Sequence, residues 1–424
     1  MFSLKSDGGI FYGWWIVIAC SLLTFYGAGT FFYGFTVFVH PMVKELGWSM
    51  ALISGAFSLY RLESGIGAPL AGFLLDRVGP KIVVMAGGLI WGTGFIYLSH
   101  AKTVAHFYVA FFVISFGFTF ASGTAVPSAL IAKWFMRRRG RALGVFTAVS
   151  GLSGLLVPIL SYLIDTYGWQ LTLLMMGFFT FLVTAPLSMT LRHKPEDHGL
   201  LPNGTSSSMA PKAPFAADAS GYTEVDFGVG KALVTPAFWL LSLATTIFSM
   251  TMSALFVHIV PHLISAGIEA RAASLAVVFI TLCSVLGRAG FGWLSDTLSK
   301  KWLLISAFLL QGIGLFIFSQ VHQILHLIPF VLAYAPSYGG GIVLRATITG
   351  EYYGRKNFGT IYGILVGMGT FGGIAGPVIA GLAYDSCGNF RLVFAIFALV
   401  SLFSAVLLLP LKRPRLSSNT AEQK

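Results

Sequence analysis

The chain has 424 residues, of which 56% are hydrophobic and only 10% are charged, and its mean hydropathy is +0.81. Soluble domains carry about 25% charged residues, so this composition excludes an ordinary water-soluble enzyme and indicates a protein that crosses the membrane many times. The formal net charge of +12 follows from membrane topology, as the loops show below, and we expect no nucleic-acid partner.

Apolar segments long enough to span a bilayer, about 20 residues each, follow one another along the whole chain. They lie near residues 12–40, 49–75, 81–99, 103–132, 141–166, 168–191, 236–266, 270–296, 302–320, 324–350, 358–384 and 389–411. The polar stretch between the sixth and seventh spans has the composition of a flexible linker. The sequence therefore predicts an all-α membrane protein with twelve transmembrane helices: a six-helix bundle at 1–191, a cytoplasmic linker at 192–235, a second six-helix bundle at 236–411 and a cytoplasmic tail at 412–424.

Basic residues are distributed unequally between the two sides of these spans. Twenty of the 27 lysines and arginines fall on the side that carries both ends of the chain, four fall on the other side, and three lie inside spans. Because cytoplasmic loops carry the excess of lysine and arginine, we expect both termini in the cytoplasm. The compact loops and the lack of a recognisable targeting signal favour the plasma membrane.

The first span carries polar aromatic side chains. Tyr26, Thr30 and Tyr33 fall on one face of a helix. A tyrosine hydroxyl that faces a cavity can bind an anion, and Tyr33 is the candidate, although aromatic stripes also serve packing alone.

The second span contains two ionisable residues, Arg61 and Glu63. Charged groups at membrane depth are costly and usually face a water-filled pathway or a partner charge. Two residues apart on a helix, these side chains point in different directions and cannot pair with each other. Glu63 is a candidate proton carrier, and the alternative is a structural partner of an arginine.

The seventh span carries His258 and His262 four residues apart. This spacing can hold a metal ion, but no third ligand is evident, so we expect no metal site. His258 is a candidate proton-sensitive or substrate-contacting residue of a cavity, and a hydrogen-bonded packing histidine is the alternative.

The eighth span contains the strongest candidate for anion binding, Arg288. It shares one helical face with Thr281, Ser284 and Ser295, and it lies eight residues, about 12 Å, before Asp296 at the membrane surface. A guanidinium group can bind a carboxylate through two hydrogen bonds, with Ser284 one turn away. The alternative is a pairing with a carboxylate or carbonyl of another helix. Arg345, in the tenth span, is expected to form a local ion pair with Glu351.

The two halves of the chain repeat each other. The segment that begins Gly72-Phe-Leu-Leu-Asp76 recurs 220 residues later as Gly292-Trp-Leu-Ser-Asp296. Gly144, Gly154 and Pro158 recur as Gly363, Gly373 and Pro377 at an offset of 219. Six spans followed by six in the same order form a parallel repeat, which predicts a binding site between the halves near the membrane midplane.

The loop between the second and third spans resembles the signature loop of the major facilitator superfamily. Its characteristic residues are Gly72, Asp76, Arg77, Gly79 and Lys81, with a degenerate second copy that contains Asp296. The resemblance implies two six-helix bundles that rock about a central cavity, with these residues acting as a gate. It also places the face that bears Arg61 at the junction between the halves, where Arg61 would act as a latch or contact substrate.

A narrower resemblance is to the oxalate/formate antiporter and monocarboxylate porter branch. It rests on the entry to the first span at 7–15, on the eighth span at 286–296, and on Phe358-Gly359-x-x-Tyr362-Gly363. It implies that Arg288 pairs with the substrate carboxylate. The oxalate exchanger also uses a lysine in the eleventh span, but no lysine or arginine occurs here from Asn357 to Cys387, which favours a single carboxylate.

We therefore expect a secondary transporter of small organic anions, most readily monocarboxylates, that works by proton symport or anion exchange. A larger organic anion or a hydrophobic compound is the alternative substrate, and a membrane sensor without transport is a further alternative. We expect no enzymatic activity and no cofactor. The expected partners are the anion, protons and the lipid bilayer.

Overall fold

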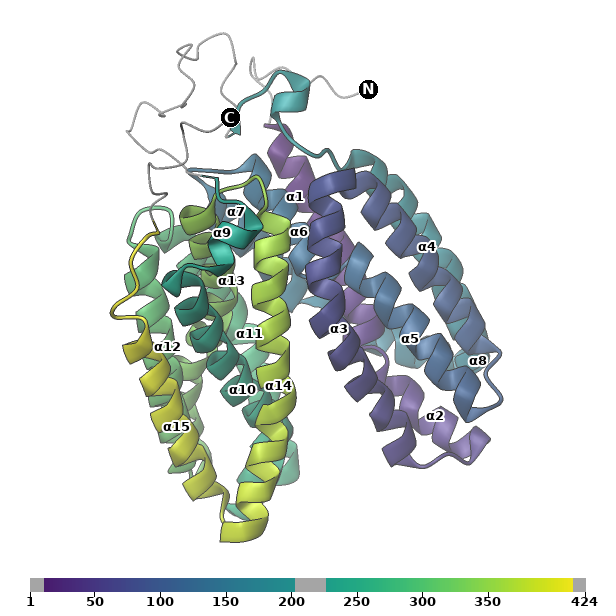
Figure 1. Ribbon diagram of the computed structural model, residues 1–424. Coiled ribbons are helices and arrows are strands. Elements are labelled where there is room, and N and C mark those ends of the chain that lie inside the picture. Colours follow the sequence, from purple (N-terminus) through teal and green to yellow (C-terminus); the bar gives the residue numbers. More distant parts are fainter. Residues whose placement is uncertain (1–10, 203–225, 415–424) are drawn as a thin grey trace.

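The computed structural model describes residues 11–202 and 226–414, and these residues are almost entirely helical. They form two helical bundles that lie side by side, α1 to α8 in one and α10 to α15 in the other (Figure 1). Within the described residues, ten stretches meet the length and hydropathy of a membrane span. One of them, 139–190, is broken at Gly168, whose φ of 78° is not helical, and α3 adds a further long helix. The described residues thus confirm the predicted all-α membrane fold.

Within the described residues, the N-terminal bundle consists of three broken spans and three continuous ones. Its elements are α1 (Tyr12–Gly27), the π-helix η1 (Ala28–Phe32), α2 (Thr36–Leu46), α3 (Met50–Val78), α4 (Pro80–Ser99), α5 (Val104–Ala121), α6 (Ala125–Trp134), α7 (Arg139–Gly151), η2 (Ser153–Leu156) and α8 (Val157–Thr190). The sequence predicts the first, fourth and fifth spans as single helices, whereas the structure interrupts each of them. Irregular backbone at membrane depth is tolerated where it lines a cavity or is buried in protein, and these breaks surround the candidate site described below.

The C-terminal bundle has longer, continuous helices. They are α10 (Pro236–Ser265), α11 (Ala270–Leu294), α12 (Lys300–Ser319), α13 (Leu327–Tyr353), α14 (Phe358–Cys387) and α15 (Phe390–Leu407), with short turns η6 (Ile324–His326) before α13 and, in the linker, η3 (Glu196–His198) and α9 (Val229–Leu233). Proline occurs inside α10, α13 and α14 without breaking them.

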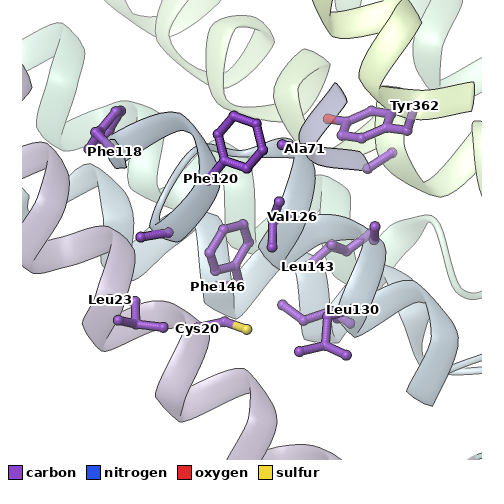
Figure 2. Packing of buried hydrophobic residues seen from close by; sticks show 14 of the residues in the cluster. Cys20, Leu23, Ala71, Phe118, Phe120, Val126, Leu130, Leu143, Phe146 and Tyr362 are labelled. Atoms are coloured by element: carbon purple, nitrogen blue, oxygen red, sulfur yellow. The ribbon is translucent and has the colours of Figure 1, made fainter. Parts of the chain in front are cut away.

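Aromatic and branched side chains fill the interior of the N-terminal bundle. Figure 2 shows this packing where α1, α6 and α7 meet, through Leu23, Val126, Leu130, Leu143 and Phe146. All five side chains are buried. This cluster holds the short helices α6 and α7 in place on either side of the turn at residues 135–138.

Glycines bring the two bundles into direct backbone contact. A Cβ atom on Gly292 of α11 would lie 2.6 Å from the carbonyl oxygen of Gly140 and 2.9 Å from the Cα of Gly144, both in α7. Gly72 of α3 meets the backbone of Gly359 in α14 in the same manner. Small residues allow helices to approach this closely. We call the end of the molecule where α7 and α14 begin the gate end; toward the opposite end, which carries α2, the bundles diverge (Figure 1).

Candidate substrate pathway between the two bundles

A central cavity of about 200 Å³ lies between the bundles. The breaks in the N-terminal bundle supply much of its wall, because Ala28, Phe32 and Gly123 line it. Its polar side chains are Thr24, Tyr33, Tyr60, Ser64, Ser122, Thr124, Thr147, Ser150 and Arg288. Among the described residues that line this cavity, Arg288 alone carries a charge.

Arg288 reaches from α11 across the interface to the N-terminal bundle. Its Nη1 donates a hydrogen bond of 2.5 Å to the carbonyl oxygen of Thr147, and its guanidinium carbon lies 5.6 Å from the ring centroid of Tyr338. A Cβ atom on Gly151 would lie 3.1 Å from Nη1, so the glycine leaves room for the guanidinium group. Nε is buried without a hydrogen-bond partner among the described residues. The arginine therefore contacts a backbone carbonyl, as the alternative prediction states, and one of its N–H groups has no acceptor in the described structure.

The predicted tyrosine stripe of the first span separates into two environments. Tyr33 lines the central cavity. The hydroxyl of Tyr26 instead lies 2.8 Å from Thr180 Oγ1 and donates to the carbonyl oxygen of Met176 in the bundle core. Thr30 donates to the carbonyl oxygen of Tyr26. Tyr33 differs because the helix is interrupted just before it.

Ser284 lies away from the central cavity, although the helical face predicted it beside Arg288. It is fully buried, its hydroxyl donates to the carbonyl oxygen of Thr281, and its backbone contacts Gly339 of α13. The hydroxyls that line the cavity with Arg288 come from the other bundle, and sequence reasoning missed all of them except that of Tyr33. The Ser122-Gly123-Thr124 turn after α5 was a signal for them, since small and polar residues there interrupt an apolar span.

Arg61 and Glu63 face different neighbours, as their spacing predicted. The Arg61 guanidinium carbon lies 5.9 Å from the ring centroid of Phe32, and a Cβ atom on Gly373 of α14 would lie 3.4 Å from its Nη1. Glu63 is 7% exposed and points into the N-terminal bundle, where Oε2 accepts a 3.0 Å hydrogen bond from Thr119 Oγ1. Its Oε1 has no hydrogen-bond partner within the described part of the chain.

The two histidines of α10 bind backbone carbonyls on different helices. Nε2 of His258 lies 3.1 Å from the carbonyl oxygen of Pro377, and Nε2 of His262 lies 3.1 Å from that of Phe318. His258 does not line the central cavity. Residues 11–202 and 226–414 contain no group of three metal-ligating side chains.

Arg345 does not form the predicted ion pair with Glu351. Glu351 instead binds Lys300, with Nζ and Oε2 2.5 Å apart. Arg345 donates from Nε to the carbonyl oxygen of Gly341 on its own helix at 3.1 Å and from Nη1 to Ser249 Oγ at 3.4 Å. The prediction was wrong because α13 turns Arg345 toward the interface between the bundles and Glu351 toward α12.

Two aspartates each contact the opposite bundle at the gate end. Asp76 Oδ2 accepts hydrogen bonds from the backbone nitrogen and the hydroxyl of Thr360, at 2.9 and 3.0 Å. Asp296 accepts hydrogen bonds from the backbone nitrogens of Gly140 and Arg141, at 2.7 and 3.2 Å. Each carboxylate thus binds the N-terminus of a helix in the opposite bundle, where free N–H groups and the helix dipole favour negative charge.

A buried lysine joins this gate to the linker. Lys133 Nζ lies 2.8 Å from Asp76 Oδ1 and 2.9 Å from Nε2 of His193. The carbonyl oxygen of Lys133 accepts a hydrogen bond from Arg355 at the entrance to α14, and Arg355 forms an ion pair of 3.0 Å with Glu196. The linker therefore contacts both bundles at the gate end.

The remaining residues of the signature loop are Arg77, Gly79 and Lys81. The Arg77 guanidinium carbon lies 4.5 Å from the ring centroid of Phe73. Gly79 has a φ of 84°, which favours glycine, and ends α3. Lys81 is exposed. Of this loop, Asp76 and Gly72 contact the opposite bundle directly.

Comparisons with known proteins agree with this architecture. The sequence profile of the Major Facilitator Superfamily matches residues 14–343 and 245–424. Monocarboxylate transporter 12 of Rattus norvegicus is 24% identical over 95% of this chain and 85% of its own length, and monocarboxylate transporter 11 of Homo sapiens is 28% identical over 83% and 71%. The solved structure of the superfamily transporter FucP in the outward conformation has a TM-score of 0.71 at 14% identity, covering 94% of this chain and 99% of that one.

Proposed function

The chain belongs to the major facilitator superfamily and is a multi-pass secondary transporter rather than an enzyme, and on this premise we propose that it moves small organic monocarboxylates. The similarity to monocarboxylate transporters over most of the chain supports this substrate class. We further propose that both termini lie in the cytoplasm and that the protein resides in the plasma membrane. In that orientation, the gate end is the cytoplasmic end.

The observation that carries the proposal is the charge balance of the central cavity. One guanidinium group faces about 200 Å³ of space, and no described lining residue is acidic. A bound monocarboxylate neutralises the charge of Arg288. A dicarboxylate brings a second negative charge, for which the described lining residues offer no second cation. Burying an unpaired charge is costly, so a single carboxylate is favoured.

The contacts of Arg288 suggest how binding would be coupled to movement. In this structure its Nη1 donates to Thr147 in the opposite bundle. A substrate carboxylate offers a stronger, charge-assisted acceptor and would replace that carbonyl while Tyr33 donates from the other wall. The exchange releases one contact between the bundles, which favours the rocking that opens the gate end.

Proton coupling is proposed for Glu63, whose buried carboxyl has one oxygen free of hydrogen bonds in the described structure. Its Thr119 partner lies on α5, the helix that ends at the cavity wall. Symport requires such a group to bind a proton on one side of the membrane and release it on the other. His258 is the second candidate, and anion exchange without a coupled proton is the alternative mechanism.

The test is uptake of labelled lactate, pyruvate, acetate, formate and oxalate into proteoliposomes, with and without an inward proton gradient. We expect uptake of a monocarboxylate, and Arg288→Ala should lower kcat/KM by about 10- to 100-fold, since a hydrogen bond to a charged group contributes about 1.5–3 kcal/mol. Arg288→Lys should recover part of this loss. Lys102→Ala, at an exposed loop lysine, serves as the control. Uptake of oxalate alone, or of none of the five anions by correctly inserted protein, contradicts the proposal.

A further inference from the structure

A second, smaller chamber adjoins the central cavity. It encloses about 130 Å³ and shares Thr124, Thr147 and Ile342 with the central cavity. We call it the inner chamber. Its remaining wall includes Arg345 of α13 and Tyr362 of α14, so that it too lies between the two bundles.

The inner chamber lies between the central cavity and the gate. On α6 it is lined by Ser128, one helical turn beyond Thr124, and on α7 by Leu143, one turn before Thr147. Because α6 runs toward the gate end and α7 begins there, both displacements point toward the gate. An anion that leaves the central cavity through the gate would cross this chamber.

Arg345 brings a cation into this chamber without a carboxylate partner among the described residues. Its guanidinium group contacts the carbonyl oxygen of Gly341, the hydroxyl of Ser249 at the long distance of 3.4 Å, and the ring of Phe248, whose centroid lies 5.4 Å from the guanidinium carbon. Neutral groups compensate a buried guanidinium poorly. The nearest acidic residue on its own helix, Glu351, is already bound to Lys300.

The rest of the chamber lining suits a small anion. Tyr362 and Ser128 add hydroxyl groups, and the described lining contains no acidic side chain. A guanidinium with hydroxyl donors nearby is the donor set that a carboxylate requires. The volume of about 130 Å³ limits the ligand to a few heavy atoms.

We propose that Arg345 forms a second anion-binding site, which receives the substrate carboxylate after it leaves Arg288 and before it passes the gate. This inference rests on the proposed function, in which Arg288 binds the carboxylate first. Two sites in series serve passage because each binds the ion strongly enough to admit it and weakly enough to release it. Without the guanidinium group of Arg345, a carboxylate leaving Arg288 would cross a chamber whose described lining offers neutral hydroxyl groups and apolar side chains such as Leu143 and Val343, and no positive charge.

The direct test is anomalous X-ray diffraction from crystals of the full-length protein grown with bromide as the only halide. We expect one bromide peak beside each guanidinium group. Arg345→Gln should remove the inner peak and leave the peak at Arg288, and Arg288→Gln should do the reverse. Bromide at Arg288 without bromide in the inner chamber overturns this inference alone. Bromide in the inner chamber without bromide at Arg288 overturns the proposed first site alone. The absence of bromide from both sites overturns both proposals.

Transport distinguishes a site on the pathway from an adventitious halide site. We expect Arg345→Gln to lower the maximal uptake rate of the monocarboxylate at least about tenfold while KM changes less than about threefold, because the first binding step at Arg288 is intact. Arg345→Lys should restore part of the rate, and Lys102→Gln should match the wild type. A wild-type maximal rate in folded Arg345→Gln overturns the proposal. If Arg345→Gln does not fold, the bromide experiment on the wild type and the rate of Arg345→Lys still decide it.

Discussion

Asp76 and Asp296 lie 220 residues apart, and each accepts hydrogen bonds from the N-terminus of a helix in the bundle opposite its own. Asp76 of the N-terminal bundle binds the first turn of α14, and Asp296 of the C-terminal bundle binds the first turn of α7. The gate end is therefore held by two equivalent carboxylate-to-helix contacts related by the internal repeat. Because the two contacts are equivalent, loss of either should loosen the same closed state.

We expect Asp76→Asn and Asp296→Asn each to raise the rate at which an impermeant thiol reagent, applied from the gate side, modifies Ser128→Cys in the inner chamber. The background would lack the three native cysteines. Hydrogen bonds to a charged group contribute about 1.5–3 kcal/mol, so the rate should rise about tenfold or more. Asp385→Asn, at an exposed position, is the control. Unchanged modification in both variants would show that these contacts do not hold the gate.

The close approach of α7 and α11 gives a second prediction with a matched control on the same helix. Gly292→Ala places a methyl group against the backbone of Gly140 and Gly144, whereas a Cβ atom on Gly290 meets nothing within 4 Å. Overpacking of this kind costs about 1–3 kcal/mol. Here it would destabilise the closed state of the gate, in which α7 and α11 are in contact. Gly292→Ala should lower uptake and speed modification of the inner-chamber cysteine, while Gly290→Ala should do neither. Equal effects of the two variants would contradict the packing argument.

The role proposed for Glu63 as proton carrier can be distinguished from anion binding by comparing uptake driven by a proton gradient with exchange of internal for external substrate. Glu63→Gln keeps the shape of the side chain but cannot change its charge. We expect this variant to lose stimulation of uptake by a proton gradient while exchange of internal for external substrate stays within about twofold of the wild type. Thr119→Val, which removes the hydrogen bond to Glu63, should shift the pH dependence of uptake. Gradient-driven uptake that survives in Glu63→Gln would transfer the role to His258, tested by His258→Asn.

The contact between the linker and the gate predicts a pH dependence. Burial lowers the pKa of His193 from 6.5 to about 4, and the positive charges of Lys133 and Lys194 act in the same direction. The negative charges of Asp197 and Asp76 raise this pKa, but their effect is smaller. The closed gate thus binds fewer protons at His193 than a state in which this side chain is released. Its contribution to closure is fully present above about pH 6.5 and is lost as the pH falls toward 4.

The measurement is the modification rate of the same inner-chamber cysteine between pH 7.5 and 5, corrected for the reactivity of a model thiol. The wild-type rate should rise below pH 6.5. His193→Gln retains an acceptor for Lys133 but cannot be protonated, and its rate should stay flat. An identical rise in this variant would assign the pH dependence to another group.

The sequence alone predicts the membrane fold because the bilayer imposes simple requirements on it. Each span needs about 20 apolar residues with its backbone hydrogen bonds satisfied internally, and hydropathy records this directly. The spacing along the chain also identifies Asp296 as the repeat of Asp76, and the resemblance of that motif to the superfamily's signature loop implies that both carboxylates belong to the gate. The candidate anion ligand Arg288 is identifiable because an arginine at membrane depth is rare and costly.

Tertiary structure decided which side chains share a cavity. Tyr26 and Tyr33 share one helical face by spacing, and in the structure Tyr33 lines the cavity whereas the Tyr26 hydroxyl binds Thr180 in the bundle core. Ser284 shares a helical face with Arg288 but packs against Gly339, and Arg345 turned away from Glu351 toward the inner chamber. Such outcomes depend on the rotation of each helix and on the neighbour it meets across 8–10 Å, and hydropathy and spacing along one chain do not encode either.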